Sequence, residues 1–414
     1  MTKKHKKLSD KKLFAVLFVV FLYGFSICNW YLHGTEVTEK TEAEIKKIQT
    51  GETNAKEAVL ALEGTVNEEL FLRYPLIEIY GFLQKAMGKQ EDNGFDKVRD
   101  KNGFLHNGNF WNGHGDDQKE LALRVCRLAE SLKSSGTKTG AVLWPMKLAE
   151  PDARYYGIPY NDYTKLSDSM AAWLRYYGMP LLDLRHLMEE TGMSQEEFFY
   201  KTDHHWTPPA AFEGYLRVLD WMQEEFGEVL DLTGELHKRE SYHWKTYENV
   251  MLGSQGQDTG LLYAGGLEDQ TVVYPKEEGS YTLKAGTLEE YETKEGSFQE
   301  ALLKTDLYIK NYKELYQQKA TGAYLGSGIQ EYASIENHDA DLDKSVLLLR
   351  DSFAQPVGAF LAQSFRKVDM LWTLEITEEE LSEFLSENHY DYVLIAVYPE
   401  NLTSDAFPFG KEES

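Results

Sequence analysis

The sequence predicts an α/β fold: a doubly wound parallel sheet that carries an irregular, partly β insertion and follows one N-terminal transmembrane helix. Three observations support this fold class. From about residue 97, short apolar runs alternate with segments of helical periodicity. An uncharged apolar stretch lies near the N-terminus, and a Gly-, Tyr- and Thr-rich segment interrupts the alternation over residues 236–330. Repeated strand–helix units favour parallel strands with helices on both faces.

The N-terminal segment is predicted to be an uncleaved membrane anchor. Residues 13–32 contain no charge, and their length suits a helix that spans the hydrocarbon core of a bilayer. Residues 1–12 contain six lysines, so the positive-inside rule predicts that the N-terminus is cytoplasmic. The protein is thus expected to cross the cell membrane once and to expose the domain after the anchor on the extracellular side. A cleaved signal peptide is the alternative. Against it, no A-x-A-like site follows the apolar run, and Ile27 before Cys28 makes a poor lipoprotein site.

Composition excludes several classes of protein. Hydrophobic residues make up 42% and charged residues 27% of the chain, which excludes a fully disordered protein. The formal net charge of −25 argues against a nucleic-acid partner. Cys28 lies in the predicted anchor and Cys126 on a predicted helix, so we expect no intramolecular disulfide and no zinc finger.

The chain is expected to comprise six consecutive segments. They are a cytoplasmic basic tip (1–12), the anchor (13–32), a Glu-, Lys- and Thr-rich stalk (33–64), the first part of the α/β domain (65–235), the insertion (236–330) and the second part of the α/β domain (331–414). Neither an internal repeat nor a long low-complexity tract interrupts this order.

Local patterns predict the elements of the α/β domain. Short apolar runs predict strands at 141–144, 180–184, 346–349, 368–372 and 392–397. Helical spacing and start signals predict helices at 121–132, 170–177, 208–226, 354–365 and 378–387. Capping signals are Ser194-x-x-Glu197, Thr207 before two prolines, and Thr377-x-x-Glu380.

Two polar segments lie where such sheets gather functional groups, at strand ends and helix starts. Ser352 follows a buried strand and precedes a helix, whose first N–H groups can stabilise an oxyanion. A serine becomes nucleophilic when a histidine accepts its proton and a carboxylate orients that histidine. If residues 203–205 are extended, Asp203 and His205 share a face and His204 points away. We therefore predict Ser352 as nucleophile, His205 as general base and Asp203 as orienting carboxylate.

These residues also have ordinary structural explanations. Ser352 or Asp351 could simply cap the following helix, and the two histidines could bind backbone carbonyls. A metal site on residues 203–205 is disfavoured, because three consecutive residues do not converge easily on one ion. The other histidines show no ligand spacing, so we expect no metal and no cofactor.

Together the two segments resemble a known family. Asp-x-His-Trp-Thr at residues 203–207, followed by Asp-Ser-Phe at 351–353, is similar to the SGNH-hydrolase-like polysaccharide O-acetyltransferases of the alginate type (AlgX/AlgJ-like). The string Asp-His-His-Trp at 203–206 resembles the Gram-positive branch called the DHHW family. The similarity spans roughly residues 65–405, with weaker matches at 101–105, 252–254, 324–326 and 391–395.

The resemblance implies an SGNH-like fold and an enzyme. It implies that Asp203, His205 and Ser352 form a triad, and that the serine carries an acetyl group and passes it to a sugar hydroxyl. It also implies two partners: a polysaccharide acceptor, and a multi-pass membrane acyltransferase of the MBOAT type that supplies acetyl across the membrane. A single-pass anchor and an extracellular domain suit such a partner.

The chain departs from the family pattern near the serine. Arg350 stands where Gly is usual, and Gln355 where Asn is common. The family pattern therefore does not identify the residues that donate hydrogen bonds to the oxyanion. The candidates are Gly326, Gly328, Gln355 and Asn401. Candidates for a sugar groove, each of which also suits packing or solvation, are Lys147, Tyr155, Tyr156, Tyr160 and Trp206.

Three functions compete on this evidence. The first is an extracytoplasmic O-acetyltransferase that uses an acyl-Ser intermediate. The second is an SGNH carbohydrate esterase that removes acetyl groups with water as acceptor. The third is a non-catalytic glycan-binding or assembly subunit. The same triad serves the first two, so the acceptor and the partner decide between them.

Overall fold

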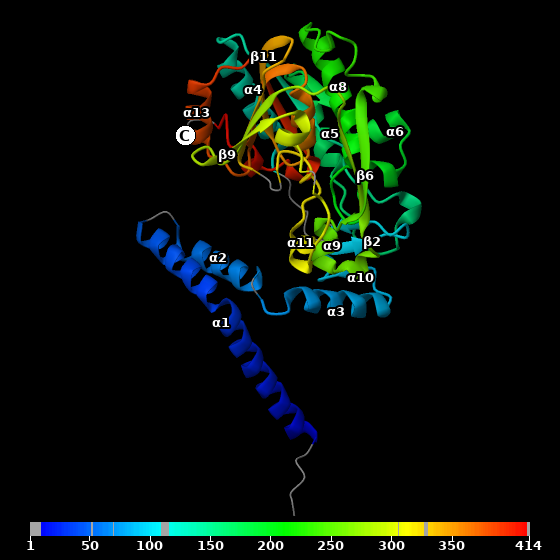
Figure 1. The fold of residues 1–414 in the computed structure, drawn as a ribbon, viewed down its shortest axis with the longest axis vertical. Helices are drawn as coiled ribbons and strands as arrows, with labels where there is room; N and C mark the ends of the chain where they lie inside the picture. Colours follow the sequence, from blue (N-terminus) through cyan, green and yellow to red (C-terminus); the bar gives the residue numbers. More distant parts are fainter. Residues whose placement is uncertain are drawn as a thin grey trace, which may run out of the picture. The chain divides into compact units, whose positions relative to one another are not determined.

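The computed structural model describes residues 10–50, 53–68, 70–108, 116–304, 306–326 and 330–411. The chain divides into two compact units, Met1–Ile79 and Tyr80–Ser414. The division falls within the sequence of helix α3 (Arg73–Ala86), which is labelled in Figure 1.

The first unit contains helices α1 (Asp10–Thr50) and α2 (Ala55–Glu68). Within α1, the segment Lys11–Thr35 is long and apolar enough to cross a membrane. Helix α1 continues to Thr50 because Glu and Lys are good helix formers, and Lys47 pairs with Glu44 at 2.8 Å one turn away. The predicted anchor and the start of the predicted stalk are therefore one helix.

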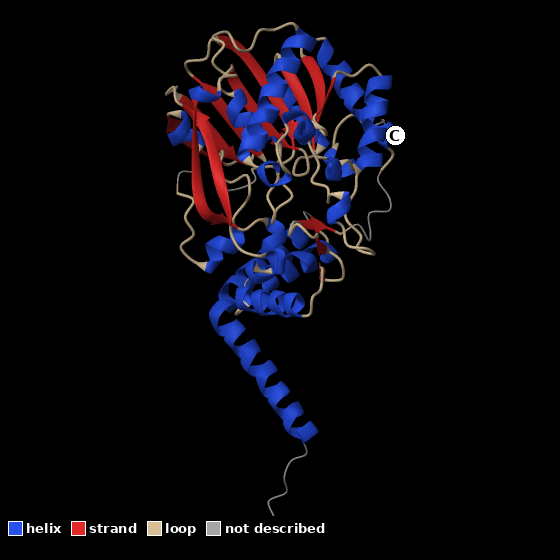
Figure 2. Ribbon diagram, turned by 90° about the vertical axis from the view of Figure 1, so that its right-hand side faces the viewer, coloured by secondary structure: helices blue, strands red, loops and turns tan. Residues whose placement is uncertain are grey.

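In the described residues, the second unit is centred on a mixed sheet of eight strands, drawn in red in Figure 2. The strand order is β5-β4-β13-β11-β12-β10-β8-β9. Its parallel part consists of β4 (Lys138–Leu143), β5 (Leu181–Asp183), β11 (Leu342–Arg350), β12 (Phe365–Trp372) and β13 (Tyr392–Val397). These strands overlap the predicted apolar runs, and the predicted fold class is confirmed.

Antiparallel strands extend this sheet. Strand β10 (Tyr332–Asn337), just after the predicted insertion, pairs with β12 and with β8 (Tyr281–Gly286) of the insertion, and β8 pairs with β9 (Tyr291–Gly296). The sequence pattern did not predict this, because strand partners are chosen by contacts between distant segments. The rest of the insertion comprises β6 (Tyr242–Met251) paired with β7 (Glu268–Pro275), α9 (Ser254–Thr259), α10 (Leu261–Ala264), a π-helical turn (Phe298–Leu302) and α11 (Tyr312–Gln317).

Helices cover both faces of the sheet (Figure 2). Along β11, Val346 and Leu348 pack in one buried cluster with α8 (Pro208–Phe226) and α12 (Ala354–Leu361). Leu347 and Leu349 pack in another cluster with α4 (Gln118–Lys133), α5 (Thr164–Tyr176) and α13 (Glu378–Glu387). Because side chains alternate along a strand, a strand buried on both faces needs a continuous apolar run, as β11 has.

The three predicted capping signals are confirmed, whereas the helices predicted to start at 121 and 170 begin earlier, at Gln118 and Thr164. The side chains of Ser194, Thr207 and Thr377 each accept a hydrogen bond from the backbone N–H three residues later. Ser194 begins α7 (Gln195–Phe198), and Thr207 begins α8. The remaining elements are α6 (Leu187–Thr191), β1 (Glu91–Asp92), β2 (Lys97–Arg99) and β3 (Leu105–Asn107), of which the three strands form a small antiparallel sheet.

Candidate active site

Ser352 lies in the turn between β11 and α12, at the carboxyl end of a central parallel strand. Its Oγ lies 2.7 Å from Nε2 of His205, although 147 residues separate the two in the sequence. Both side chains are buried, with 9% of Ser352 and 6% of His205 exposed. The fold thus brings together the hydroxyl and the imidazole that the sequence analysis paired.

Asp351 shapes the turn that presents this serine. Its carboxylate accepts hydrogen bonds from the Phe353 N–H at 3.0 Å, from the Tyr398 N–H and from the Asn401 amide at 3.2 Å. Burial raises the pKa of Asp351, and these donors oppose the rise. The acid next to Ser352 is therefore committed to holding the backbone.

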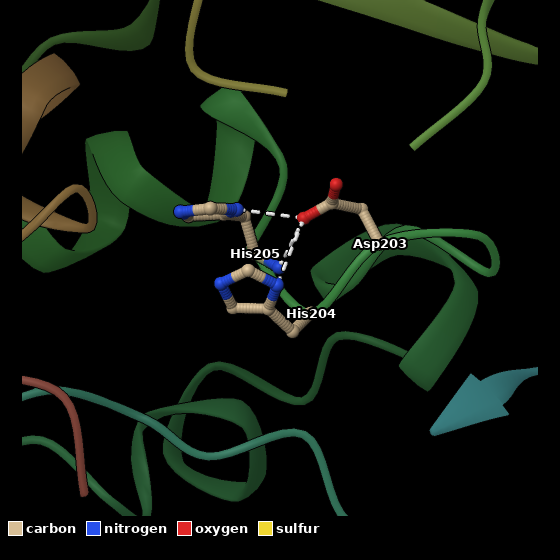
Figure 3. Close-up of side chains that lie close together, drawn as sticks. All are labelled: Asp203, His204 and His205. Carbon is tan, nitrogen blue, oxygen red and sulfur yellow. Dashed lines mark hydrogen bonds and ion pairs between the residues drawn. The ribbon is translucent and has the colours of Figure 1, made fainter. Parts of the chain in front are cut away.

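Asp203 and His205 meet in the loop between α7 and α8. Asp203 Oδ1 lies 2.6 Å from Nδ1 of His205 and also accepts the His205 backbone N–H at 2.9 Å. The loop is therefore a bend closed by an aspartate side chain, and the extended conformation on which the predicted pairing was conditional is not present. His204 does not point away either, because its ring centroid lies 4.0 Å from that of His205 (Figure 3).

The insertion holds this loop from outside the parallel domain. The Ser254 N–H donates to Asp203 Oδ2 at 2.7 Å, and the Gly253 N–H donates to Thr202 Oγ1 at 2.8 Å. A Cβ at Gly253 would lie 2.3 Å from the Cβ of Asp203, so only glycine permits this approach. The backbone of the insertion therefore fixes the second carboxylate oxygen, leaving the first one for His205.

Glu268 on β7 holds the same loop from another side. Its carboxylate accepts the Lys201 N–H at 2.6 Å and the Thr202 N–H at 2.8 Å. The Thr202 hydroxyl also donates to it. Carboxylates that accept several N–H groups make strong, charge-assisted bonds. Glu268 therefore fixes the backbone of Lys201 and Thr202, the two residues that precede Asp203.

Lys147 lies inside the protein beneath the loop, with 1% of the residue exposed. Its Nζ donates to the carbonyl of Asp203 at 2.7 Å, to the carbonyl of Lys201 at 3.2 Å and to Oε1 of Gln255 at 3.2 Å. Burial lowers the pKa of Lys147 to about 7, against the raising effect of nearby carboxylates, Glu268 first.

Asp203 is held in its ionised form. Burial opposes ionisation, but the charges of His205 and His204 and the hydrogen bonds from His205 and Ser254 outweigh it, so the pKa of Asp203 lies well below its usual range. An ionised carboxylate at Nδ1 favours the tautomer whose Nε2 can accept a proton from Ser352.

Asp203, His204 and His205 also form a possible metal-binding group, since their ligand atoms lie within 4.8 Å of one another (Figure 3). The Asp203 oxygens already accept His205 and Ser254, and His205 Nε2 already lies against Ser352. A cation here would have to replace the bonds that align the imidazole with the serine. The donor set therefore suits proton transfer better than metal binding.

The oxyanion candidates have separate positions. Gln355 is fully buried, and its amide donates to the Tyr324 carbonyl at 2.7 Å. The Asn401 amide donates to Asp351 beside Ser352. Gly326 has a φ of +92°, which favours glycine, and Gly328 lies outside the described residues.

Arg350, the residue before Asp351, is fully buried. Its guanidinium donates to the carbonyl of Gln330 at 2.9 Å.

The prediction of a sugar groove is corrected for Lys147, Tyr160 and Trp206, because these three residues are buried. Lys147 bonds the loop carbonyls, as described above. Tyr160 is 7% exposed and donates to the Arg99 carbonyl at 2.9 Å, while Trp206 is 2% exposed and donates to the Phe353 carbonyl at 3.2 Å. Their rings fill the interior, as large amphipathic side chains do when their polar atom finds a partner. Tyr155 is partly exposed and Tyr156 fully exposed, so these two stay surface candidates.

Sequence reasoning missed the residues that hold the loop. Glu268 carries no signal, because it is one of many acids in the insertion. The sequence offers Gly253 and Ser254 only as a weak family match. It predicts Lys147 as a groove residue or a solvated lysine, not as a buried donor. Their roles arise from contacts over more than fifty residues of sequence, which no local pattern encodes.

Known proteins resemble this chain in sequence and fold. Residues 112–259 match the family described as "SGNH hydrolase-like domain, acetyltransferase AlgX". No curated protein matches significantly. The structure of Bacillus cereus PatB1 with a sulfonyl adduct is similar at 19% identity and a TM-score of 0.60, over 76% of this chain and 98% of that one. A second PatB1 structure is similar at 20% identity and 0.57, over 75% and 98%.

A DHHW family protein from Eubacterium siraeum is similar at 15% identity and a TM-score of 0.49, over 75% of this chain and 96% of that one. The family match confirms the predicted resemblance, and the likeness to PatB1 shows the shared fold.

Proposed function

We propose that this chain is a membrane-anchored, extracytoplasmic O-acetyltransferase that acts on a cell-surface or secreted polysaccharide through an acyl-Ser352 intermediate. One observation carries the proposal: Ser352 Oγ lies 2.7 Å from His205 Nε2, while His205 Nδ1 lies 2.6 Å from Asp203. The matched acetyltransferase family supports acetyl as the transferred group. The apolar part of α1 supports the anchor, and the lysines before it support an extracellular second unit.

In the first half-reaction, Ser352 Oγ attacks the carbonyl carbon of the acetyl donor. The serine proton moves to Nε2 of His205, and Asp203 stabilises the imidazolium that forms. The bond between the acetyl carbon and the donor then breaks, and the leaving group departs with the proton from His205. The acetyl group remains as an ester on Ser352.

In the second half-reaction, a sugar hydroxyl gives its proton to His205 and attacks the acyl-Ser carbonyl. The ester bond to Ser352 breaks, and the serine oxygen takes the proton back from His205, which restores the enzyme. Each tetrahedral intermediate needs hydrogen-bond donors for its oxyanion. The Phe353 N–H is occupied by Asp351. Among the candidates we favour Asn401, because its amide nitrogen keeps a second N–H with no partner in the described residues.

The experiment that tests this mechanism uses the full-length protein in detergent. It is mixed with p-nitrophenyl acetate, with and without an unacetylated oligosaccharide, and both the protein and the sugar are analysed by mass spectrometry. We expect an acetyl group on the Ser352 peptide and, when sugar is added, acetyl on the sugar. Hydrolysis with no acetylated sugar would assign an esterase, and no acetyl on Ser352 would favour a binding subunit.

We further propose that an MBOAT-type membrane acyltransferase supplies the acetyl group. Co-expression of such a partner should raise the fraction of Ser352 that carries acetyl in isolated membranes. The comparison is a catalytically inactive variant of that partner, which should leave that fraction at the level of the chain alone. Equal acetylation with both partners would contradict this source.

A further inference from the structure

Helix α3 has two unlike faces. On one face Gly81 and Gln84 are buried. A Cβ at Gly81 would lie 2.1 Å from the carbonyl oxygen of Thr259, so the helix backbone touches the end of α9. One turn later, Lys85 Nζ donates to the Leu262 carbonyl at 2.7 Å. Through these contacts, the part of the helix that belongs to the second unit packs against α9 and the Leu262 backbone.

The opposite face of α3 is apolar and open. Its members recur at helical spacing, are between 41% and 58% exposed, and are Leu76, Ile79, Tyr80, Phe82 and Leu83. Met87, just after the helix, adds a side chain that is 64% exposed. A helix on the surface of a soluble domain normally presents polar side chains to water, so a continuous apolar face of this kind marks an interaction surface.

We propose that this face of α3 lies in the outer surface of the bilayer that α1 crosses; this rests on the membrane anchoring in the proposed function. We favour the bilayer as the occupant because the proposed anchor tethers α3 to it. The apolar segment of α1 ends at Thr35, and α3 begins at Arg73 of the same chain. An extended apolar arc with aromatic members is typical of helices that lie in the interface plane.

The charge of the helix supports the same occupant. The whole chain has a net charge of −25, which an anionic membrane would repel. Helix α3 departs from this balance: its only acid is Glu78, and the open face formed by Leu76, Ile79, Tyr80, Phe82 and Leu83 carries no acidic side chain. This uncharged apolar face is therefore a part of the acidic protein that an anionic lipid surface does not repel. Docked there, it would hold the Ser352 site close to acetyl delivered across the membrane.

The test uses the full chain in vesicles of phosphatidylethanolamine and phosphatidylglycerol. Cys28 and Cys126 are first changed to Ser, and an environment-sensitive NBD fluorophore is attached to single cysteines at Leu22→Cys, Leu83→Cys or Tyr156→Cys. Lipids carrying a nitroxide near the headgroup quench probes at the interface, and lipids carrying it deep on the acyl chain quench probes in the bilayer core such as the one at Leu22. We expect quenching of the Leu83 probe by about twofold or more, because interfacial helices lie about 5–10 Å deep, and no quenching of the fully exposed Tyr156 position.

The Leu22 probe separates the two proposals. A quenched Leu22 probe with an unquenched Leu83 probe would overturn the docking of α3 and leave the anchor intact. If neither probe is quenched, the anchor fails as well. Protection of the Leu83 probe from aqueous iodide without lipid quenching would indicate a protein on this face, such as a second copy, and would also overturn the proposal.

A charge variant provides a second measurement. The double change Ile79→Glu and Leu83→Glu should abolish lipid quenching of a probe at Met87→Cys, because two carboxylates oppose insertion into the interface. Its acetylation of Ser352 by p-nitrophenyl acetate should stay within about twofold of the unchanged chain, because both positions face solvent. Retained quenching in this folded variant would contradict the docking.

Discussion

Among the described residues of the second unit, two buried pairs of histidine and aspartate differ in their surroundings. In the first, His205 lies between Asp203 and the Ser352 hydroxyl. In the second, His106 Nε2 lies 3.1 Å from Asp100 Oδ2, and neither side chain is exposed. The other nitrogen of His106, Nδ1, has no hydrogen-bond partner among the described residues.

The second pair is built for packing. Asp100 Oδ1 accepts the Phe104 N–H at 2.9 Å, and the ring of His106 lies edge-on to Tyr160 at 5.5 Å. Burial lowers the pKa of His106 to about 4, although the bond to Asp100 opposes the shift. This imidazole therefore stays neutral at neutral pH. The comparison teaches that the two pairs differ in the second imidazole nitrogen: that of His205 adjoins a hydroxyl, as the proposed mechanism requires, and that of His106 does not.

The largest expected effect comes from removing the hydroxyl that distinguishes the two pairs. Ser352→Ala should lower the rate of p-nitrophenyl acetate turnover by about 10⁶-fold or to background, because no acyl ester can form. Release of p-nitrophenolate measures the rate. Ser364→Ala, a change at another buried serine, should keep the rate of the unchanged chain. Equal rates for the two variants would show that Ser352 is not the nucleophile.

Asparagine substitutions compare the two aspartates directly. Asp203→Asn should slow acylation by about 10⁴-fold, because an amide cannot stabilise the imidazolium and favours the wrong tautomer. Asp100→Asn should slow it by less than about tenfold, because His106 meets no nucleophile. Reaction of Ser352 with a sulfonyl fluoride, followed by mass spectrometry, measures both. Similar losses in the two variants would remove the distinction between the pairs.

Lys147 connects the two pairs, because it bonds the Asp203 carbonyl and its charge helps to lower the pKa of His106. Lys147→Met should reduce the acylation rate by about 10- to 100-fold, since the loop carbonyls lose their donor and Asp203 shifts. Measurement of acyl-Ser352 formation tests this. If the rate is unchanged, Lys147 does not position the loop.

Lys147 also predicts how stability depends on pH. Its pKa is about 7 in the folded chain and 10.5 in its ordinary state. Between these values the unfolded chain binds the extra proton, so this group makes the free energy of unfolding rise with pH, by at most about 1.4 kcal/mol per unit. Denaturant titrations from pH 7 to 10 should show this rise in the unchanged chain relative to Lys147→Met. Parallel curves would contradict the burial of a titrating ammonium.

The smallest effect on rate is expected at the second pair. His106→Phe should keep the acylation rate within about twofold, yet destabilise the fold by about 1–3 kcal/mol, because the Asp100 carboxylate loses its partner. Thermal unfolding and acylation measure the two effects on one sample. A loss of rate comparable to that of Asp203→Asn would mean that the second pair takes part in the chemistry.

Several features follow from local physics and were predictable. Strand β13 matches its predicted bounds, because a strand buried on both faces needs an unbroken apolar run. The caps at Ser194, Thr207 and Thr377 form within one helical turn, so their spacing is visible in the sequence. The pairing of Asp203 with His205 was predicted for the wrong reason, because a side-chain-closed bend, not an extended strand, brings them together.

Residue types and short spacings were therefore enough to indicate the α/β class, the apolar helix and the three chemical groups of the site. The folded chain alone decided that Ser352 meets His205, that Glu268 and Ser254 hold the loop, and that Lys147, Tyr160 and Trp206 are interior. It also added antiparallel strands to the sheet. The physical reason is the distance along the sequence over which each interaction acts. Helix caps and hydrophobic periodicity involve residues a few positions apart, whereas burial and the pairing of strands and side chains depend on segments that meet only after the chain has folded.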